Sequence, residues 1–203
     1  KMVRSWRSSD GARAVICRPS IVVGHSETGY TTHFHGFYGL PRAWQIAIQK
    51  FGDISRMRLP ALPEKTVNLV PINYVVQAIR TLFEARRHQG KIFHLTNPEP
   101  PTLESLTRAM EKVFETTGPR FVSLQQFLLR PPTAEERFSL KLVERYAPYL
   151  RFPEATFDQT QTREALKGEN IDIPVLNETA LERLIAAARI LSSQTPSFIE
   201  NAA

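Results

Sequence analysis

Cysteine is almost absent from this 203-residue sequence, and the single residue Cys17 excludes a disulfide within the chain. Cys17 lies in the apolar run 14–17, which predicts a small buried hydrophobe in a reducing, cytoplasmic environment. Long apolar runs are also missing, since no stretch reaches the roughly 18 apolar residues that a membrane-spanning helix needs, and no signal-peptide core is present. We therefore expect at most peripheral membrane contact.

The excess of basic over acidic residues gives a net charge of +6, which favours acidic partners such as phosphates or coenzyme A. Nucleic-acid binding is not predicted, because the basic residues are scattered along the chain rather than clustered with aromatic side chains. No metal site is predicted either, since His33 and His35 lack a third ligand nearby. We expect these two histidines to line an amphipathic substrate entrance.

The first third of the chain predicts a strand, a long loop and a helix. Residues 14–19 form a β-branched apolar run that is typical of a buried parallel strand, and residues 21–24 continue it in extended form. Residues 25–39 are too irregular for a helix or a strand, and loops of this length are usually functional. Apolar residues at helical spacing then predict a helix over 40–51, before the prolines of 59–63 interrupt the chain.

The middle third repeats the alternation of strand and helix. We predict a short strand at 67–70, an amphipathic helix over 74–86, and a second buried strand at 91–96. Thr102 is a good cap for a further helix that begins there. Strands that alternate with helices predict an α/β fold with a parallel sheet.

The composition changes at Gly118, after which prolines separate short helical segments and no strand is predicted. We therefore divide the chain into an α/β part, 1–117, and a helical lobe, 118–203. The terminal helix, about 178–191, has one apolar face, which we expect to dock on the core. The apolar residues between 121 and 129 are expected either to pack in a core or to wall a tunnel for an acyl chain: Phe121, Leu124, Phe127, Leu128 and Leu129.

Four segments of the chain resemble one family. Residues 18–29, RPSIVVGHSETG, are similar to the segment that follows the Tyr-x-x-x-Lys helix in extended short-chain dehydrogenases of the male-sterility, fatty acyl-CoA reductase and thioester-reductase branch. VNLVPINYVV at 67–76 resembles a later strand, turn and helix of that family, in which an aspartate commonly stands at the place of Asn73. FHLTN at 93–97 resembles its last core strand, and FDQTQTREAL at 157–166 resembles a C-terminal element of bacterial acyl reductases.

The resemblance implies the C-terminal part of a Rossmann-type fold, with a few parallel strands and flanking helices, joined to a mainly helical substrate-side lobe. It implies a substrate loop at about 25–65. The residues expected to face the cofactor NADP (or NAD) are Pro19, Ser20, Ile21 and Val22. The residues expected to bind substrate are His25, Ser26, Thr28, Gly29, Pro71 and Asn73. The residues alone leave an alternative for each set. The first set is equally typical of the end of a strand. The second set is equally typical of an ordinary loop, in which Asn73 is the N-cap of the next helix.

Two motifs of the family are missing from the sequence. No Gly-x-x-Gly-x-x-Gly loop is present, and none of the five tyrosines is followed four residues later by lysine. Residues 1–6 read as the last turns of an uncapped helix, so we expect a missing N-terminal Rossmann part to supply both motifs and to be required for cofactor binding. The chain alone is predicted to have no catalytic residue and no activity.

The function implied is the substrate-side portion of an NAD(P)H-dependent reductase in lipid metabolism, acting on a fatty acyl-CoA or a carrier-protein-bound acyl thioester. A non-catalytic binding or scaffold module remains an alternative, because both motifs are missing. Part of an NAD-dependent sugar-nucleotide epimerase or dehydratase is a further alternative, although RPSIVVG differs from the motif usual after that strand in those enzymes.

Overall fold

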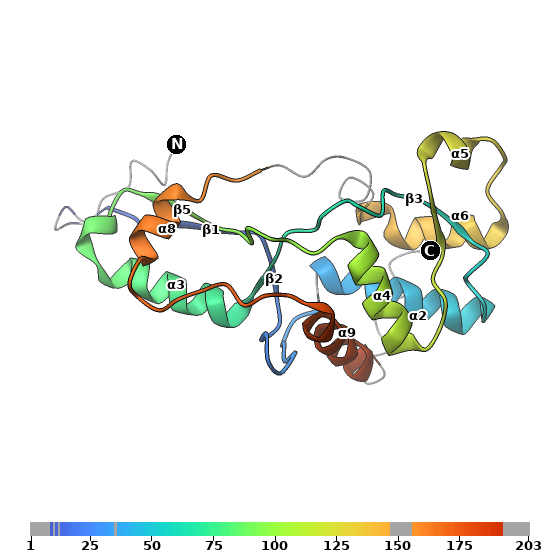
Figure 1. Cartoon of the computed structure of the whole chain (residues 1–203), viewed down its shortest axis with the longest axis horizontal. Helices are drawn as coiled ribbons and strands as arrows, with labels where there is room; N and C mark the ends of the chain where they lie inside the picture. The colour runs from blue at the N-terminus through green and yellow to red at the C-terminus, as the bar shows by residue number, and fades with distance from the viewer. Residues whose placement is uncertain (1–8, 10, 12, 35, 147–155, 193–203) are drawn as a thin grey trace.

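The computed structural model describes residues 9, 11, 13–34, 36–146 and 156–192 (Figure 1). Two groups of elements follow one another along the long axis of the molecule, and strand β2 (Ile21–Val23) lies between them. The first group contains β1 (Ile16–Pro19), α3 (Ile72–Glu84), β5 (Ile92–Leu95) and α8 (Thr160–Leu166). The second contains most of the remaining helices. Among the described residues, no helix has both the length and the apolar character needed to cross a bilayer.

The three strand pairs in the described part of the chain are all parallel, which confirms the α/β fold with parallel strands. β1 pairs with β5, and β2 pairs with β4 (Leu69–Pro71). The third pair joins β3 (Arg58–Pro60) to β6 (Arg120–Val122). The prediction of no strand after Gly118 was therefore wrong at β6, because a three-residue strand is too short to show a periodic pattern.

Strand β1 corrects a second expectation. Its apolar sequence predicted a buried strand, but Ile16 and Cys17 are only half-buried, and Arg18 and Pro19 are exposed. Burial still raises the pKa of the Cys17 thiol. Among the described residues, β1 pairs on one edge only, with β5, so its second edge has no neighbouring strand to cover it.

Helices α2 (Gly39–Phe51) and α3 begin and end close to their predicted limits, and α4 (Leu103–Phe114) begins where it was predicted to begin. Thr102 caps α4 as predicted, since its side chain accepts a hydrogen bond of 3.1 Å from the Ser105 N–H. The alternative role of Asn73 as an N-cap was wrong. Pro71 occupies the N-cap of α3, and no side chain caps that helix.

Two hydrophobic cores hold the described residues together. The larger unites β2, α2, α4 and α9 (Glu178–Ser192), and the smaller unites β4, α3, β5 and α8. Leu181, Leu184 and Ile185 of α9 are fully buried, so the predicted docking of the terminal helix is confirmed. A fully buried leucine contributes roughly 1.5–3 kcal/mol. Each core takes residues from both sides of residue 117, and the division into two lobes stays a prediction.

The apolar residues around α5 (Leu124–Leu128) confirm the prediction of core packing only in part. Phe121 is half-buried and packs against the larger core. Leu124, Leu128 and Leu129 are exposed and form neither a core nor the wall of a tunnel. Phe127 alone is buried there, with the Arg58 guanidinium 4.7 Å from its ring centre. The short helix turns its other side chains toward solvent, and helical spacing alone could not show this.

A buried ion pair ties β3 to α6 (Ala134–Val143). The Glu136 side chain is 1% exposed and accepts two hydrogen bonds of 2.8 Å from the Arg58 guanidinium. These hydrogen bonds lower the pKa of Glu136 from 4.5 to about 2. The pair therefore stabilises the fold fully above pH 4.5, and this contribution is lost as the pH falls toward 2.

We expect Glu136→Gln to lower the thermal midpoint at neutral pH by on the order of 10 °C, because the Arg58 charge stays buried without its partner. The difference from the unchanged protein should shrink as the pH falls from 4.5 toward 2, as followed by circular dichroism. Glu84→Gln is the control, since it removes an exposed pair with Arg80 and should change little at any pH. Equal effects of the two substitutions would contradict this account.

Candidate functional site

One buried amide joins the ends of three strands. Asn68, directly before β4, accepts hydrogen bonds at Oδ1 from the Ser20 hydroxyl (2.7 Å) and the Asn97 N–H (2.8 Å). Its Nδ2 donates to the Asn97 carbonyl at 2.9 Å, and Asn97 Nδ2 donates to the carbonyl of Leu69. We call Ser20, Asn68 and Asn97 the Asn68 junction. It fixes the carboxyl ends of β1 and β5 against the start of β4.

The four residues predicted to face the cofactor form the bend at this junction. Pro19 ends β1 and is exposed, while Ser20 lies half-buried between β1 and β2. The Ser20 N–H donates to the backbone carbonyl of Leu95, and the Ile21 N–H donates to the backbone carbonyl of Asn68. Ile21 and Val22 lie half-buried in β2. The structure thus brings these residues together at the carboxyl ends of parallel strands, the position where α/β folds bind ligands.

The predicted substrate residues 25–29 form a tight loop after β2. The Gly24 N–H donates to the Tyr38 hydroxyl at 2.8 Å, and the Gly29 N–H donates to the His25 carbonyl at 2.8 Å. A Cβ atom at Gly24 would lie 2.5 Å from the Gly29 carbonyl oxygen, so only glycine allows this close approach. Tyr38 is 2% exposed, and burial raises its pKa, which keeps the phenol neutral.

Ser26 and Asn73 hold each other rather than facing solvent. The Ser26 N–H donates to Asn73 Oδ1 at 3.0 Å, and Asn73 Nδ2 donates to the Ser26 hydroxyl at 3.1 Å. Pro71 lies nearby at the end of β4, paired in register with Val23. This arrangement fastens the loop to the first turn of α3. Within the predicted set, the side chains of His25 and Thr28 remain the most accessible polar groups of the loop.

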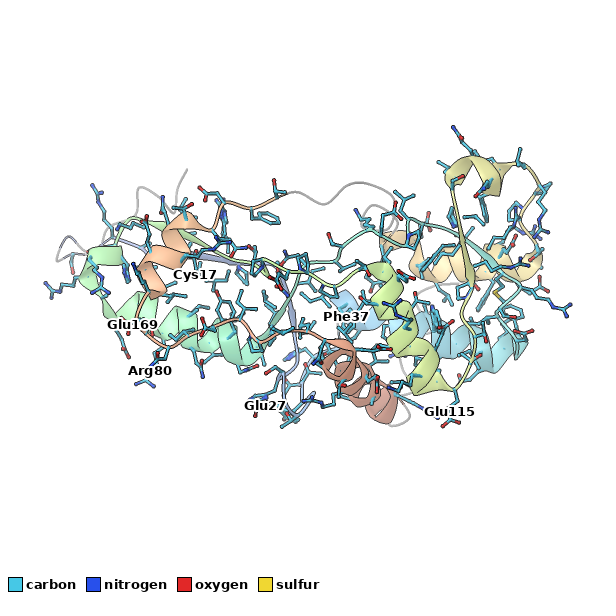
Figure 2. The ribbon with its side chains drawn as sticks, viewed as in Figure 1. Cys17, Glu27, Phe37, Arg80, Glu115 and Glu169 are labelled. Atoms are coloured by element: carbon cyan, nitrogen blue, oxygen red, sulfur yellow. The ribbon has the colours of Figure 1, made fainter. Side chains whose placement is uncertain are left out.

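Helix α9 fastens the same loop from the other side. Arg183 Nη1 donates to the carbonyls of Ser26 (3.1 Å) and Glu27 (2.8 Å), residues more than 150 positions earlier in the chain. Gly29 has φ +70°, and a Cβ atom there would lie 2.5 Å from the Arg183 carbonyl oxygen. Figure 2 shows Glu27 in this loop beside α9. Arg183 was not predicted as a site residue, because no local motif marks it.

A cavity of about 760 Å³ opens beside the junction, between α3, residues 97–99, α8 and residues 167–175. Leu166, Ile171 and Ile173 give it an apolar lining, and charged side chains including Arg163 and Lys167 also line it. Tyr74 lines it as well, although the residue is only 4% exposed, and burial raises the pKa of its phenol to about 12. None of the sequence-predicted site residues lines this cavity.

No metal site is predicted at His33 and His35. His33 is exposed, with Nδ1 2.8 Å from the Thr32 hydroxyl, and His35 lies outside the described residues. Within the described part of the chain, no group of three histidine, cysteine, aspartate or glutamate side chains is placed to bind a metal ion. His94, expected in a buried strand, is only half-buried, and its Nδ1 lies 3.1 Å from the Asp158 carbonyl oxygen.

Comparison with known proteins gives consistent matches. Residues 1–79 match an NAD-binding family model described as male sterility protein. Aldehyde reductase lnaA of Aspergillus flavus is 26% identical over 204 residues, which cover 91% of this chain and 18% of that protein. The terminal R domain from the myxalamid PKS-NRPS biosynthetic pathway is 20% identical with a TM-score of 0.61, and the match covers 89% of this chain and 44% of that chain.

A thiolation-reductase di-domain from an archaeal non-ribosomal peptide synthetase is 18% identical with a TM-score of 0.63, over 89% of this chain and 36% of that chain. The chain therefore spans less than half the length of each of these proteins. The resemblance to the male-sterility and thioester-reductase branch is confirmed. The structural likenesses show the Rossmann-like α/β fold.

The Asn68 junction makes a prediction about stability. Asn68→Ala would leave the buried N–H and carbonyl of Asn97 without these partners, and we expect it to lower the free energy of unfolding by roughly 2–4 kcal/mol. Ser20→Ala removes one half-buried hydroxyl and should cost less than about 1 kcal/mol. Urea unfolding measures both variants, and equal losses would show that Asn68 does not organise the junction.

Proposed function

We propose, starting from the match of residues 1–79 to the male sterility family, that this chain forms the substrate-side part of an NAD(P)H-dependent reductase. Its substrate would be a fatty acyl-CoA or an acyl thioester on a carrier protein. The observation that carries the proposal is the RPSIVVG segment, which bends at the carboxyl ends of parallel strands and leads into an anchored polar loop. The likeness to a thiolation-reductase di-domain supports the carrier-bound form of the substrate.

Pro19, Ser20, Ile21 and Val22 would form one wall of the cofactor site. Bound NAD(P)H would supply the hydride that reduces the acyl carbonyl. The bend offers an exposed proline ring and a short apolar strand, a surface suited to a flat aromatic group. The Asn68 side chain holds this wall by accepting the Ser20 hydroxyl at 2.7 Å, and two hydrogen bonds of 2.8 and 2.9 Å with Asn97 fix the Asn68 amide in turn. The chain's own role is therefore to orient the ring and keep water from it.

The loop at 25–29 would contact the substrate. Ser26, Asn73 and Pro71 position it, and Gly29 allows α9 to approach. The Glu27 N–H donates to His25 Nδ1 at 3.2 Å, which leaves Nε2 to carry the proton of the neutral ring. His25 and Thr28 can then hydrogen-bond the polar groups of a pantetheine arm, while the small Gly29 leaves room beside it.

The reaction also needs a pyrophosphate-binding loop and a proton donor for the carbonyl oxygen. The sequence contains neither Gly-x-x-Gly-x-x-Gly nor Tyr-x-x-x-Lys, so these would come from further polypeptide of the reductase. This is why we expect the chain to be inactive alone. A scaffold without redox chemistry is the competing function, and the sequence is compatible with it for the same reason.

Calorimetry with NADPH and NADH tests the proposal. The two proteins are this chain and a version extended upstream to the length of the solved reductase domains. We expect only the extended version to bind the cofactor and to oxidise it with an acyl-CoA. Binding by neither protein would overturn the proposal and favour the scaffold.

Substitutions in the extended version locate the substrate. We expect His25→Ala and Thr28→Val each to raise the KM for the thioester roughly three- to tenfold, the loss of about one hydrogen bond, with the Kd for NADPH unchanged. Tyr74→Phe is the matched control, because it removes one hydroxyl from the separate cavity. A rise in KM for Tyr74→Phe alone would place the substrate in that cavity instead.

A further inference from the structure

The cavity beside α3 is lined by none of the residues predicted to bind the cofactor or the substrate. Its volume of about 760 Å³ lies within the roughly 300–1,000 Å³ typical of sites for small ligands. Leu166, Ile171 and Ile173 give it an apolar lining, and the same side chains pack in the smaller core. Figure 1 shows the segment 167–175 running beside α3 on its way from α8 to α9. We call this space the α3 cavity.

The phenol of Tyr74 reaches the α3 cavity without a hydrogen-bond partner. The residue is 4% exposed, and its hydroxyl makes no hydrogen bond with any described residue, whereas the buried Tyr38 hydroxyl accepts the Gly24 N–H. Thr96 Oγ1 is the one fully enclosed side-chain oxygen or nitrogen that lacks a partner among the described residues, so the Tyr74 oxygen keeps an accessible surface. Buried polar groups are nearly always paired, and an unpaired phenol at a cavity wall is therefore a group that a ligand can satisfy.

Four charged side chains line the α3 cavity, two of each sign: Arg163, Lys167, Glu99 and Asp172. Arg163 and Lys167 are four residues apart, which places them on one side of α8 and its C-cap. None of the four forms an ion pair with a described residue. An apolar ligand would remove water from these charges without pairing them, and an anion would lie near two carboxylates. A ligand that carries one charge of each sign matches the cavity.

The wall of the cavity at residues 170–176 also has free backbone groups. Within the described part of the chain, no backbone-to-backbone hydrogen bond involves these residues. Ile171 and Ile173 are half-buried, whereas Asp172 between them is exposed, which is the alternation of an extended strand. Extended segments with unpaired N–H and C=O groups bind peptides by adding a strand. The backbone therefore favours a peptide over other ligands that carry both charges.

We infer that the α3 cavity is a second ligand site of this chain and binds a short apolar peptide with free termini. The peptide carboxylate would pair with Arg163 or Lys167. Its ammonium would pair with Glu99 or Asp172, while its side chains rest on the apolar lining and the Tyr74 hydroxyl donates to one of its carbonyls. A fatty acid fits less well, because it has no positive group for the two carboxylates. The inference does not depend on the proposed reductase function.

Calorimetry on this chain with three probes tests the charge requirement. Trileucine carries both charges, N-acetyl-trileucine amide carries neither, and octanoate carries only the negative charge. We expect trileucine to bind at least about tenfold more tightly than either of the others, because it alone pairs both signs. Equal binding of trileucine and either other probe would overturn the inference, and so would the absence of trileucine binding at millimolar concentration.

Substitutions in the cavity test its lining. We expect Tyr74→Phe to weaken trileucine binding roughly three- to tenfold, the loss of about one hydrogen bond. Arg163→Gln with Lys167→Gln replaces two exposed side chains, so the fold should be kept, and trileucine should bind at least about tenfold more weakly. His25→Ala is the control, since His25 does not line the cavity and its loss should leave trileucine binding unchanged. Cavity variants that bind trileucine as tightly as the unchanged chain contradict the inference.

Hydrogen exchange shows where the peptide lies. With saturating trileucine, the amides of residues 170–176 should exchange more slowly, because they would pair with the peptide backbone. The amides of residues 25–29 should exchange as before. Protection at 25–29 in place of 170–176 would put the peptide in the candidate substrate loop and overturn the inference. Neither measurement needs a cofactor, so a failure of the proposed reductase function is seen separately.

Discussion

The buried amide of Asn68 is the interaction on which the rest of the structure depends. It joins the bend after β1 to Asn97, two residues after β5, by hydrogen bonds of 2.7–2.9 Å. The chain passes between its two cores here, because Val23 belongs to the larger core and Val70 to the smaller. An apolar side chain at residue 68 would leave buried backbone groups unpaired. The Asn68 side chain therefore fixes both the position of the candidate cofactor wall and the relative placement of the two cores.

The loop that follows β2 shows how a short segment becomes a fixed surface. Asn73 holds it from α3, Arg183 holds it from α9, and the Tyr38 hydroxyl receives the N–H of Gly24. These contacts use most of the loop's polar groups internally. What remains for a ligand is a small set of side chains on a rigid support, which lowers the entropy cost of binding.

The open surfaces of the chain agree with the missing motifs. Ile72, Val76, Ile79 and Phe83 of α3 are exposed, and no strand among the described residues pairs with the second edge of β1. The sequence contains neither a Gly-x-x-Gly-x-x-Gly loop for the pyrophosphate nor a Tyr-x-x-x-Lys proton donor. Both observations have the same explanation if this chain provides one wall of a site that further polypeptide completes. The cavity beside Tyr74 lies apart from the predicted site residues, so its contents are independent of that explanation.

The sequence by itself determined the elements with strong local patterns: the parallel α/β character, α2, α3, α4, the cap at Thr102 and the docking face of α9. The sequence also showed the family resemblance, because each motif that carries it is a short stretch of consecutive residues. It missed β6, the exposure of β1 and of the leucines near α5, and the role of Asn73. Only the tertiary structure decided that Ser20 meets Asn68 and that Arg183 meets the loop, because periodicity reports which face of an element is apolar, whereas a polar group's partner depends on which distant segment folding brings within 3 Å.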